Sequence, residues 1–302
     1  MTIAWTAGHA MPRPEAGAAT GFLDGELVMA GGTVWDGDTK LWLKDVQIYQ
    51  PSKDTWRPGP ALPVPLSYGA FVHSEDGLEI FGGSDGAQVY RESWKLDKTK
   101  SQWHPTGTLP ADLLLGRAAR IGNAVYLFGG CPDVADLTKC TDAVWRRDGS
   151  GPWHRESTLP GGALAMPAIA VARNHVYLFG GCSMPAAGAL ANRAEAYSYE
   201  PRKNTWTTLR ALPKANRGPS AVAVDDRLIY VFGGYADSGF SAEVLVYDIE
   251  ANAYRTSTPM PVALLGIDFM KSGRTVYGAG GEDRMRGRSA RLLKGQLPEA
   301  SR

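Results

Sequence analysis

Short apolar runs recur along the chain at intervals of about fifty residues, and each run ends in a pair of glycines. Two examples are Ala124–Phe128 and Leu228–Phe232. These runs are apolar throughout and rich in aromatic and β-branched residues, so they predict strands that are buried on both faces. The glycine pairs are Gly31-Gly32, Gly82-Gly83, Gly129-Gly130, Gly180-Gly181, Gly233-Gly234 and Gly280-Gly281. A regular period of this length predicts a β-propeller built from repeated four-stranded blades.

A second landmark recurs in register with the first. Six times an aromatic residue is followed, seven residues later, by a proline, and the glycine pair comes about twenty residues after the proline. These landmarks are Trp5/Pro12, Trp56/Pro63, Trp103/Pro110, Trp153/Pro160, Trp206/Pro213 and Tyr254/Pro261. The agreement of three landmarks in six repeats predicts an all-β, six-bladed propeller.

Each repeat divides into four strands, a to d. Strand a is small and aliphatic, as in Ala168–Ala172, and is expected nearest the axis, where blades converge. Strand b is the apolar run before the glycines. Strand c includes Val46–Tyr49, and strand d carries the repeated aromatic residue. Polar turn formers such as Pro51–Asp54 connect c to d.

The chain ends predict how the ring closes. Trp5 and Pro12 are strand d landmarks without the rest of their blade, and the last repeat has no terminal aromatic of its own. Residues 2–8 are therefore expected to complete the sixth blade, which removes exposed sheet edges. The expected blades are 13–63, 64–110, 111–160, 161–213, 214–261, and 262–295 together with 1–12, all within one domain, 1–302.

Composition limits the classes of partner. The 302 residues include 32 basic and 31 acidic side chains, 44% hydrophobic residues, 36 Gly and 20 Pro. The net charge of +1 gives no reason to expect nucleic acid or a membrane surface as a partner. No export signal or long apolar segment is visible. The chain is expected in the cytoplasm as given, or in the periplasm if a signal was removed.

The strand order predicts which loops carry function. If strand a leaves one face of the ring, the d-to-a and b-to-c loops share that face, around the axial opening. The aligned d-to-a residues are Glu15-Ala16, Ser67-Tyr68, Leu114-Leu115, Ala165-Met166, Asn216-Arg217 and Leu264-Leu265. The b-to-c loops begin at Thr33, Ser84, Cys131, Cys182, Tyr235 and Glu282. This mostly apolar mouth with few polar groups favours a small-molecule pocket, although packing across a narrow channel would give the same pattern.

The last b-to-c loop has the most unusual composition. Between Glu282 and Arg288 it contains two acids and three arginines. The simplest interpretation is a solvated charged loop. The alternative is that Glu282 stands at the rim of the axial opening as a chemical group.

These features together resemble a known family. The period and landmarks resemble kelch propellers, and the segment 62–69, the segment 82–85 and the final Gly-Glu loop resemble the bacterial N-acetylneuraminate epimerases, or sialic acid mutarotases. That family has a Glu followed six residues later by Arg and then Ser or Thr, which Glu282, Arg288 and Ser289 match. Gly287 departs from the pattern by one position. The resemblance implies an isomerase of an acidic sugar, and known members are often exported.

The residue types fit that chemistry. Mutarotation removes the proton of the anomeric hydroxyl while the ring oxygen gains one, so it needs a base and an acid and no cofactor. Glu282 is the candidate base, and Arg288, or otherwise Arg217, is the candidate partner of the sugar carboxylate. Candidate binding residues are Tyr68, Tyr235, Ser289 and Glu15. If Glu282 is not the base, the next candidates are Arg217, Asp268 and Glu15.

Other chemistries have less support in the sequence. The five histidines occupy dissimilar repeat positions and predict no metal site. Cys131 and Cys140 share one loop and could pair, but the odd cysteine count favours free thiols. The remaining functional alternative is a non-catalytic propeller that binds protein or carbohydrate. The oligomeric state stays open.

Overall fold

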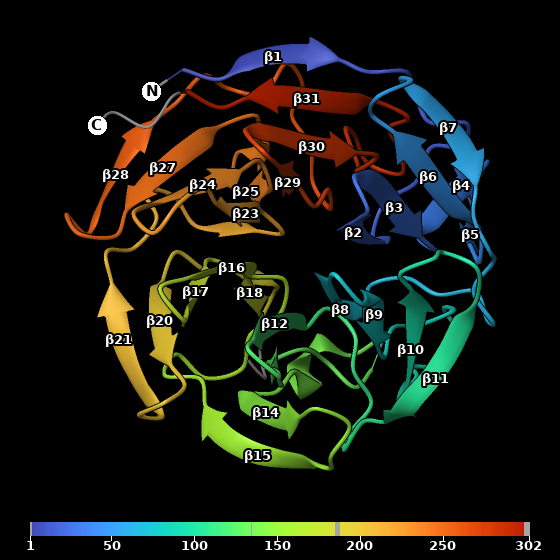
Figure 1. The fold of residues 1–302 in the computed structure, drawn as a ribbon. Helices are drawn as coiled ribbons and strands as arrows, with labels where there is room; N and C mark the ends of the chain where they lie inside the picture. Colours follow the sequence, from blue (N-terminus) through green and yellow to red (C-terminus); the bar gives the residue numbers. More distant parts are fainter. Residues whose placement is uncertain (1, 134, 185–187, 299–302) are drawn as a thin grey trace.

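A computed structural model describes residues 2–133, 135–184 and 188–298. Its principal elements are six four-stranded antiparallel sheets, arranged as a ring around an axis (Figure 1). The first three sheets are β2 (Ala19–Leu23), β3 (Glu26–Ala30), β6 (Val46–Gln50) and β7 (Thr55–Pro58); β8 (Ala70–Ser74), β9 (Gly77–Phe81), β10 (Glu92–Asp97) and β11 (Trp103–Thr108); and β12 (Arg117–Ile121), β13 (Ala124–Phe128), β14 (Ala143–Asp148) and β15 (Trp153–Thr158).

The other three sheets follow the same order. They are β16 (Ala168–Ala172), β17 (His175–Phe179), β20 (Ala196–Glu200) and β21 (Thr205–Leu209); β23 (Ser220–Ala223), β24 (Leu228–Phe232), β27 (Val244–Asp248) and β28 (Ala253–Thr256); and β29 (Met270–Ser272), β30 (Thr275–Ala279), β31 (Leu292–Gln296) and β1 (Ala4–Ala7). The predicted β-propeller is confirmed. Strand a of each sheet, such as β12 or β16, lies innermost (Figure 1).

The fully apolar runs form the buried second strand of each sheet because both of their faces pack against neighbouring sheets. The predicted strands Ala124–Phe128 and Leu228–Phe232 coincide with β13 and β24. Phe128 and Phe232 are fully buried. The hydrophobic core is therefore divided among the interfaces between adjacent sheets.

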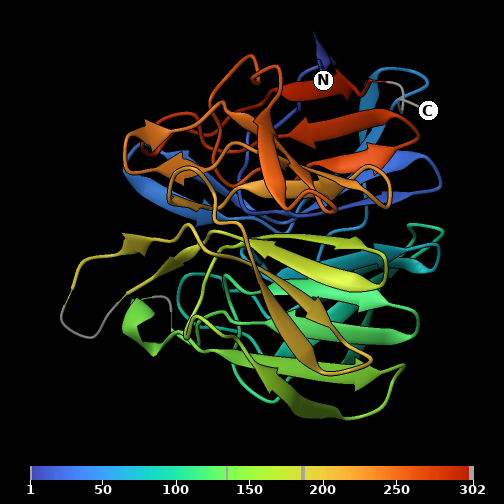
Figure 2. The same ribbon diagram turned by 90° about the vertical axis from the view of Figure 1, so that its left-hand side faces the viewer.

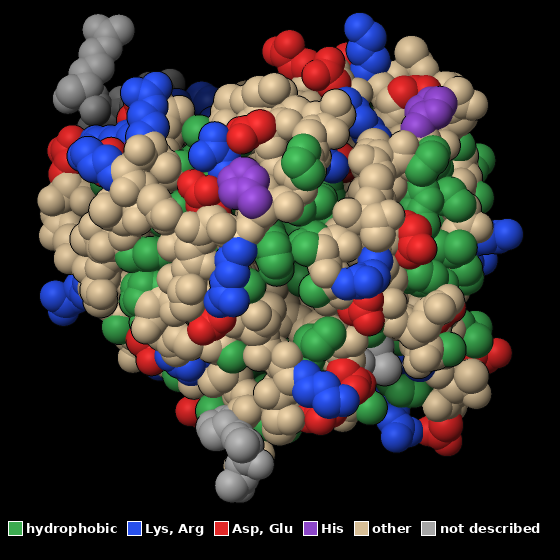
Figure 3. All heavy atoms as spheres, turned by 90° about the horizontal axis from the view of Figure 1, so that it is seen from below, with side chains coloured by type: hydrophobic (Ala, Val, Ile, Leu, Met, Phe, Trp, Pro, Cys, Tyr) green, Lys and Arg blue, Asp and Glu red, His purple; other side chains and the backbone are tan. Residues whose placement is uncertain are grey.

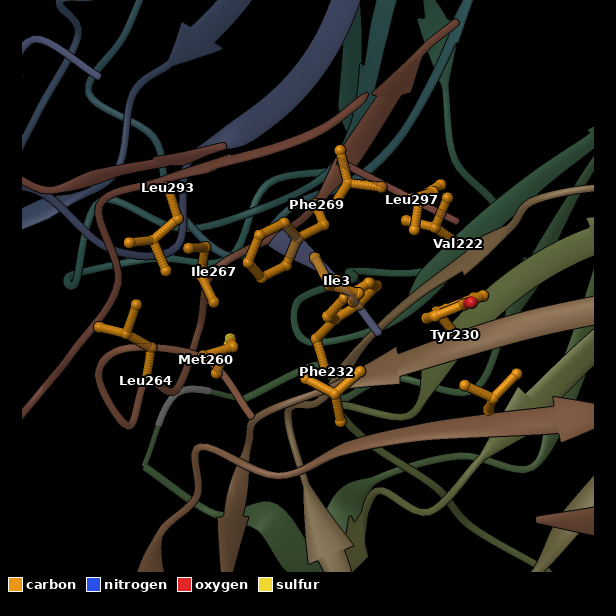
Figure 4. Close-up of a cluster of buried hydrophobic side chains, with 13 residues drawn as sticks. Ile3, Val222, Tyr230, Phe232, Met260, Leu264, Ile267, Phe269, Leu293 and Leu297 are labelled. Atoms are coloured by element: carbon orange, nitrogen blue, oxygen red, sulfur yellow. The ribbon is translucent and has the colours of Figure 1, made fainter. Parts of the chain in front are cut away.

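The N-terminal strand joins the C-terminal sheet. β1 pairs antiparallel with β31, with Ala4 opposite Gln296 and Ala7 opposite Leu293. Ile3 is 3% exposed and packs in a cluster with Phe232 and Phe269 (Figure 4). This pairing agrees with the expectation for residues 2–8.

The glycine pairs have a steric reason. Gly31 and Gly82 have positive φ angles of 74° and 65°. A Cβ at either position would collide with a backbone carbonyl oxygen of the next repeat, that of Leu66 or Leu113. Glycine is the residue that tolerates both the left-handed backbone and the close approach.

Several b-to-c segments fold into additional short strands that the repeat pattern did not predict. These are β4 (Thr33–Asp36) with β5 (Thr39–Trp42), β18 (Cys182–Ser183) with β19 (Ala191–Asn192), and β25 (Tyr235–Ala236) with β22 (Asn216–Arg217) and β26 (Gly239–Phe240). The hairpin of β18 and β19 and the 3-10 helix η1 (Leu137–Lys139) project from the same side of the ring (Figure 2). In the described part of the chain, no helix has the length and apolar character needed to cross a bilayer.

Candidate functional site

Backbone bridges join the d-to-a and b-to-c segments of every repeat on one face. Arg217 pairs with Tyr235, and isolated bridges join Ala16 with Thr33, Ser67 with Ser84, Leu114 with Cys131, Ala165 with Cys182, and Leu265 with Glu282. The bridges show which d-to-a residues are equivalent between repeats. In three repeats the equivalent residue lies one position away from the one that the sequence alignment gave. Ala16, Arg217 and Leu265 are equivalent to Ser67, so Glu15 is equivalent to the buried leucines 66, 113, 164 and 264.

Glu15 therefore lies in the core rather than on the rim. Its side chain is fully buried, and Oε2 accepts a hydrogen bond of 2.9 Å from Gln47 Nε2. Among the residues that the structure describes, none forms a hydrogen bond with Oε1. Removal from water raises the pKa of the Glu15 carboxyl to about 8, although the bond from Gln47 opposes the increase.

Ser289 is also buried, at 3% exposure. Its backbone N–H donates to the Gly281 carbonyl over 2.8 Å, and its Oγ accepts from the Arg291 N–H over 3.1 Å. These contacts fix the course of the last loop back toward the glycine pair. Ser289 is thus almost completely removed from solvent, and Glu15 completely, in this conformation.

Glu282 and Arg288 form an ion pair of 2.9 Å between Oε2 and Nη1. The Arg288 side chain is only 4% exposed, whereas Glu282 is 19% exposed. Arg288 also donates to the carbonyl and the hydroxyl of Thr33, each over 3.2 Å. Most of the guanidinium donors are therefore used within the protein, and the carboxylate is the more accessible member of the pair.

Tyr68 connects this pair to the axis. Its hydroxyl lies 3.3 Å from Thr33 Oγ1, the same hydroxyl that Arg288 contacts. Its ring meets Trp42 edge to face at 5.6 Å, and Lys40 Nζ lies 4.7 Å from the ring centre. Tyr68 adopts a left-handed backbone with φ of 60°, at a position where several other repeats have glycine.

Arg217 and Tyr235 form a second cluster in the neighbouring repeat. The Arg217 guanidinium lies 4.2 Å above the Tyr235 ring, and Nη1 donates to Asn192 Oδ1 over 2.8 Å. Asn192 Nδ2 in turn donates to Asp237 Oδ1 over 2.8 Å. The structure thus brings Glu282, Arg288 and Tyr68 into one network, and Arg217 with Tyr235 into another.

A further charged pair lies on the axis. Arg117 Nη1 and Asp268 Oδ2 are 3.4 Å apart, and both side chains line a cavity of about 40 Å³ together with Tyr68 and Met166. From the sequence, Asp268 was predicted only as an alternative to Glu282, and Arg117 was not predicted. Both residues could have been noticed in the sequence, because each is charged at a position near the start of strand a where the other repeats have a small residue.

The cysteines are unpaired thiols in the structure. Cys131 hydrogen-bonds with the thiol of Cys140, and this bond lowers the pKa of Cys131. Among the residues that the structure describes, no group of three or more His, Cys, Asp or Glu is placed to hold a metal ion.

Comparison with known proteins identifies the repeats. The Kelch motif matches residues 163–213 and 216–261. A Kelch domain-containing protein of Archaeoglobus fulgidus is 28% identical over 236 residues, which cover 74% of this chain and 64% of that protein. Kelch-like protein 35 of Mus musculus is 23% identical over 80% of this chain and 39% of its own length.

A shorter match is to a protein that is named as an enzyme. The N-acetylneuraminate epimerase of Haemophilus influenzae is 32% identical over 127 residues, which are 42% of this chain and 32% of the epimerase. The matches to these three relatives cover less than two thirds of each relative's length. Two stretches of the chain thus match the Kelch motif, and the ring of four-stranded antiparallel sheets is a β-propeller.

Proposed function

We propose that the protein is a mutarotase-type isomerase that interconverts the anomers of N-acetylneuraminic acid or a related acidic sugar. The observation that carries the proposal is the Glu282–Arg288 pair, in which a partly exposed carboxylate is held by a buried arginine. The partial similarity to an N-acetylneuraminate epimerase supports the choice of substrate class.

Glu282 is the group that takes the proton from the anomeric hydroxyl. As the ring C–O bond breaks, the ring oxygen takes a proton from solvent, and an open-chain ketone forms. Ring closure on the other face of the ketone reverses these transfers and returns the proton from Glu282. Arg288 orients the carboxylate through the 2.9 Å contact and through its bonds to Thr33.

Other repeats carry positive charge and aromatic side chains in the same bridged segments as Glu282. Arg217 has guanidinium donors beyond the one that Asn192 receives, so in this proposal it attracts the sugar carboxylate. Tyr68 and Tyr235 offer faces and hydroxyls to the sugar ring. Glu15 and Ser289, being buried, support the loop backbone instead: Gly281 N–H donates to the Glu15 carbonyl over 2.8 Å.

The test follows freshly released α-N-acetylneuraminic acid by proton NMR as it relaxes to the β-anomer. Wild-type protein should accelerate the relaxation, and Glu282→Gln should lower the catalysed rate by roughly 10²- to 10⁴-fold because it removes the base but keeps the shape. Asp283→Asn, in the same loop, is the matched control and should keep the rate. If wild type leaves the spontaneous rate unchanged, the sialic acid assignment fails.

The alternative is a non-catalytic module that binds protein or carbohydrate. The strand pair β18–β19, which projects from the ring (Figure 2), favours it because it gives the ring an uneven surface. One side of the molecule shows acidic and basic side chains scattered among hydrophobic side chains and backbone (Figure 3). A wild-type protein that binds the sugar without accelerating its relaxation would support this alternative.

A further inference from the structure

Two opposite charges occupy equivalent positions where the innermost strands of two repeats begin. The residue two places after the left-handed residue of each repeat is small in four repeats and charged in two. In chain order these residues are Ala19, Ala70, Arg117, Ala168, Ser220 and Asp268. Arg117 is the first residue of β12 in the third sheet, and Asp268 lies two residues before β29 in the sixth. These two sheets face each other across the axis (Figure 1).

The contact between these charges is loose. Arg117 Nη1 lies 3.4 Å from Asp268 Oδ2, and Arg117 Nε donates to the Pro167 carbonyl over 2.8 Å. Within the described residues, the Asp268 carboxylate makes no other hydrogen bond or ion pair. Solvent reaches both side chains, which are 16% and 17% exposed. The second carboxylate oxygen and several guanidinium donors are thus free to bind another molecule.

The cavity around the pair is small and defined. Its volume of about 40 Å³ corresponds to roughly three water molecules at about 10–15 Å³ each. Backbone hydrogen bonds form its rim: Leu115 N–H donates to the Tyr68 carbonyl, and Met166 N–H to the Leu115 carbonyl, each over 2.8 Å. A molecule of a few heavy atoms, or one end of a larger ligand, fits such a space.

We propose that Arg117 and Asp268 form an axial binding site for a small carboxylate that carries a hydrogen-bond donor on the adjacent carbon. The ligand carboxylate pairs with the planar guanidinium, and the adjacent donor satisfies Asp268. A carboxylate without such a donor binds less well because it meets the negative charge of Asp268 unscreened. The inference goes beyond the proposed isomerase, since it requires binding and no reaction.

The experiment titrates the folded, full-length protein with acetate, glycolate and glycine and follows the Arg117 Nε–H signal by two-dimensional NMR. Wild type should show saturable shifts with glycolate, glycine or both, and acetate should bind about tenfold more weakly. That factor corresponds to about 1.4 kcal/mol. Asp268→Asn should raise the affinity for acetate about tenfold, because it removes the repelling charge. Arg117→Gln should abolish binding of all three probes, measured by calorimetry.

Matched charge controls come from an exposed pair elsewhere. Arg173 and Glu250 form an ion pair of 2.7 Å at the surface, so Arg173→Gln and Glu250→Gln change net charge equally without touching the axis. Both should leave probe binding unchanged. If glycolate binds and glycine does not, the site prefers a hydroxyl donor. If glycine binds and glycolate does not, the site prefers an ammonium donor.

Two results would overturn the site. One is the absence of a saturable shift in wild type together with no gain of acetate binding in Asp268→Asn. The other is unchanged probe binding in Arg117→Gln. A gain of acetate binding in Asp268→Asn cannot result from misfolding. The proposal therefore remains testable even if Arg117→Gln is too unstable to measure. Failure of the mutarotase assay leaves these outcomes unaffected, and failure here leaves that assay unaffected.

Discussion

Glu15 places a carboxyl group where four other repeats bury a leucine. The cost of taking a charge out of water explains the raised pKa of about 8. Because the ordinary value is 4.5, the folded protein holds the proton at neutral pH while the unfolded chain releases it. The free energy of unfolding should therefore fall as pH rises from about 4.5 to 8.

This linkage gives a prediction for Glu15→Gln, which keeps the shape and removes the titration. The variant should lack the Glu15 part of the pH dependence, which amounts to at most about 1.4 kcal/mol per pH unit. Urea unfolding of both proteins between pH 5 and pH 8 measures it. The exposed Glu75→Gln is the control and should follow wild type. Parallel slopes for wild type and Glu15→Gln would contradict the burial of an ionisable Glu15.

At the scale of the element, β1 supplies an outer edge and part of a core. Ile3 is buried, the Trp5 ring lies 5.8 Å from Phe269, and Trp5 Nε1 donates to the Thr258 carbonyl over 3.4 Å. Without β1, the backbone edge of β31 would be unpaired, and such edges promote aggregation.

Deleting residues 1–12 should thus lower the melting temperature and the soluble yield strongly. Circular dichroism melting and the soluble fraction after expression are the measurements. Thr6→Ala is the control within the same strand, because Thr6 is exposed and makes only a 3.5 Å side-chain contact with the Lys294 carbonyl. A truncated protein that melts like wild type would rule out a stabilising role of the β1–β31 pairing.

A different element-scale feature links adjacent sheets by charge. Glu79 of β9 pairs with Arg147 of β14 over 2.7 Å, and both side chains are 5% exposed. The Arg147 guanidinium also lies 5.0 Å from the centre of the Trp153 ring. Glu79 also pairs with Arg120 over 3.3 Å, so a buried carboxylate between two arginines links these adjacent sheets.

For the whole molecule, stability rests on packing between sheets. The three thiols are unpaired, and the described residues contain no metal-ligand cluster. Neither EDTA nor a reducing agent such as dithiothreitol should shift the melting temperature or the activity measurably. Differential scanning fluorimetry and the NMR assay, each with and without the reagents, test this. Activity lost on chelation and restored by zinc, iron or copper would reveal an unrecognised metal site.

The sequence alone was sufficient for the architecture because its causes are local and repeated. An apolar run such as Leu228–Phe232 is stable in water only when both of its faces are buried. Glycine is needed at position 31 because the backbone is left-handed there and a carbonyl oxygen approaches closely. Only part of the candidate site could be predicted from the sequence in the same way. The spacing singled out Glu282 and Arg288 as a base and a carboxylate partner but did not predict the ion pair between them, and the assignment of their chemistry stays a prediction.

The tertiary structure decided which side chains meet and which are removed from water. A one-residue difference in alignment moved Glu15 from the expected rim into the core, because only the backbone bridges define the register between loops. Arg117 and Asp268, 151 residues apart, meet because closing the ring brings opposite sheets to one axis. The burial of a side chain and its contacts with distant residues depend on how the repeats pack around the axis. The period of the sequence does not specify that packing.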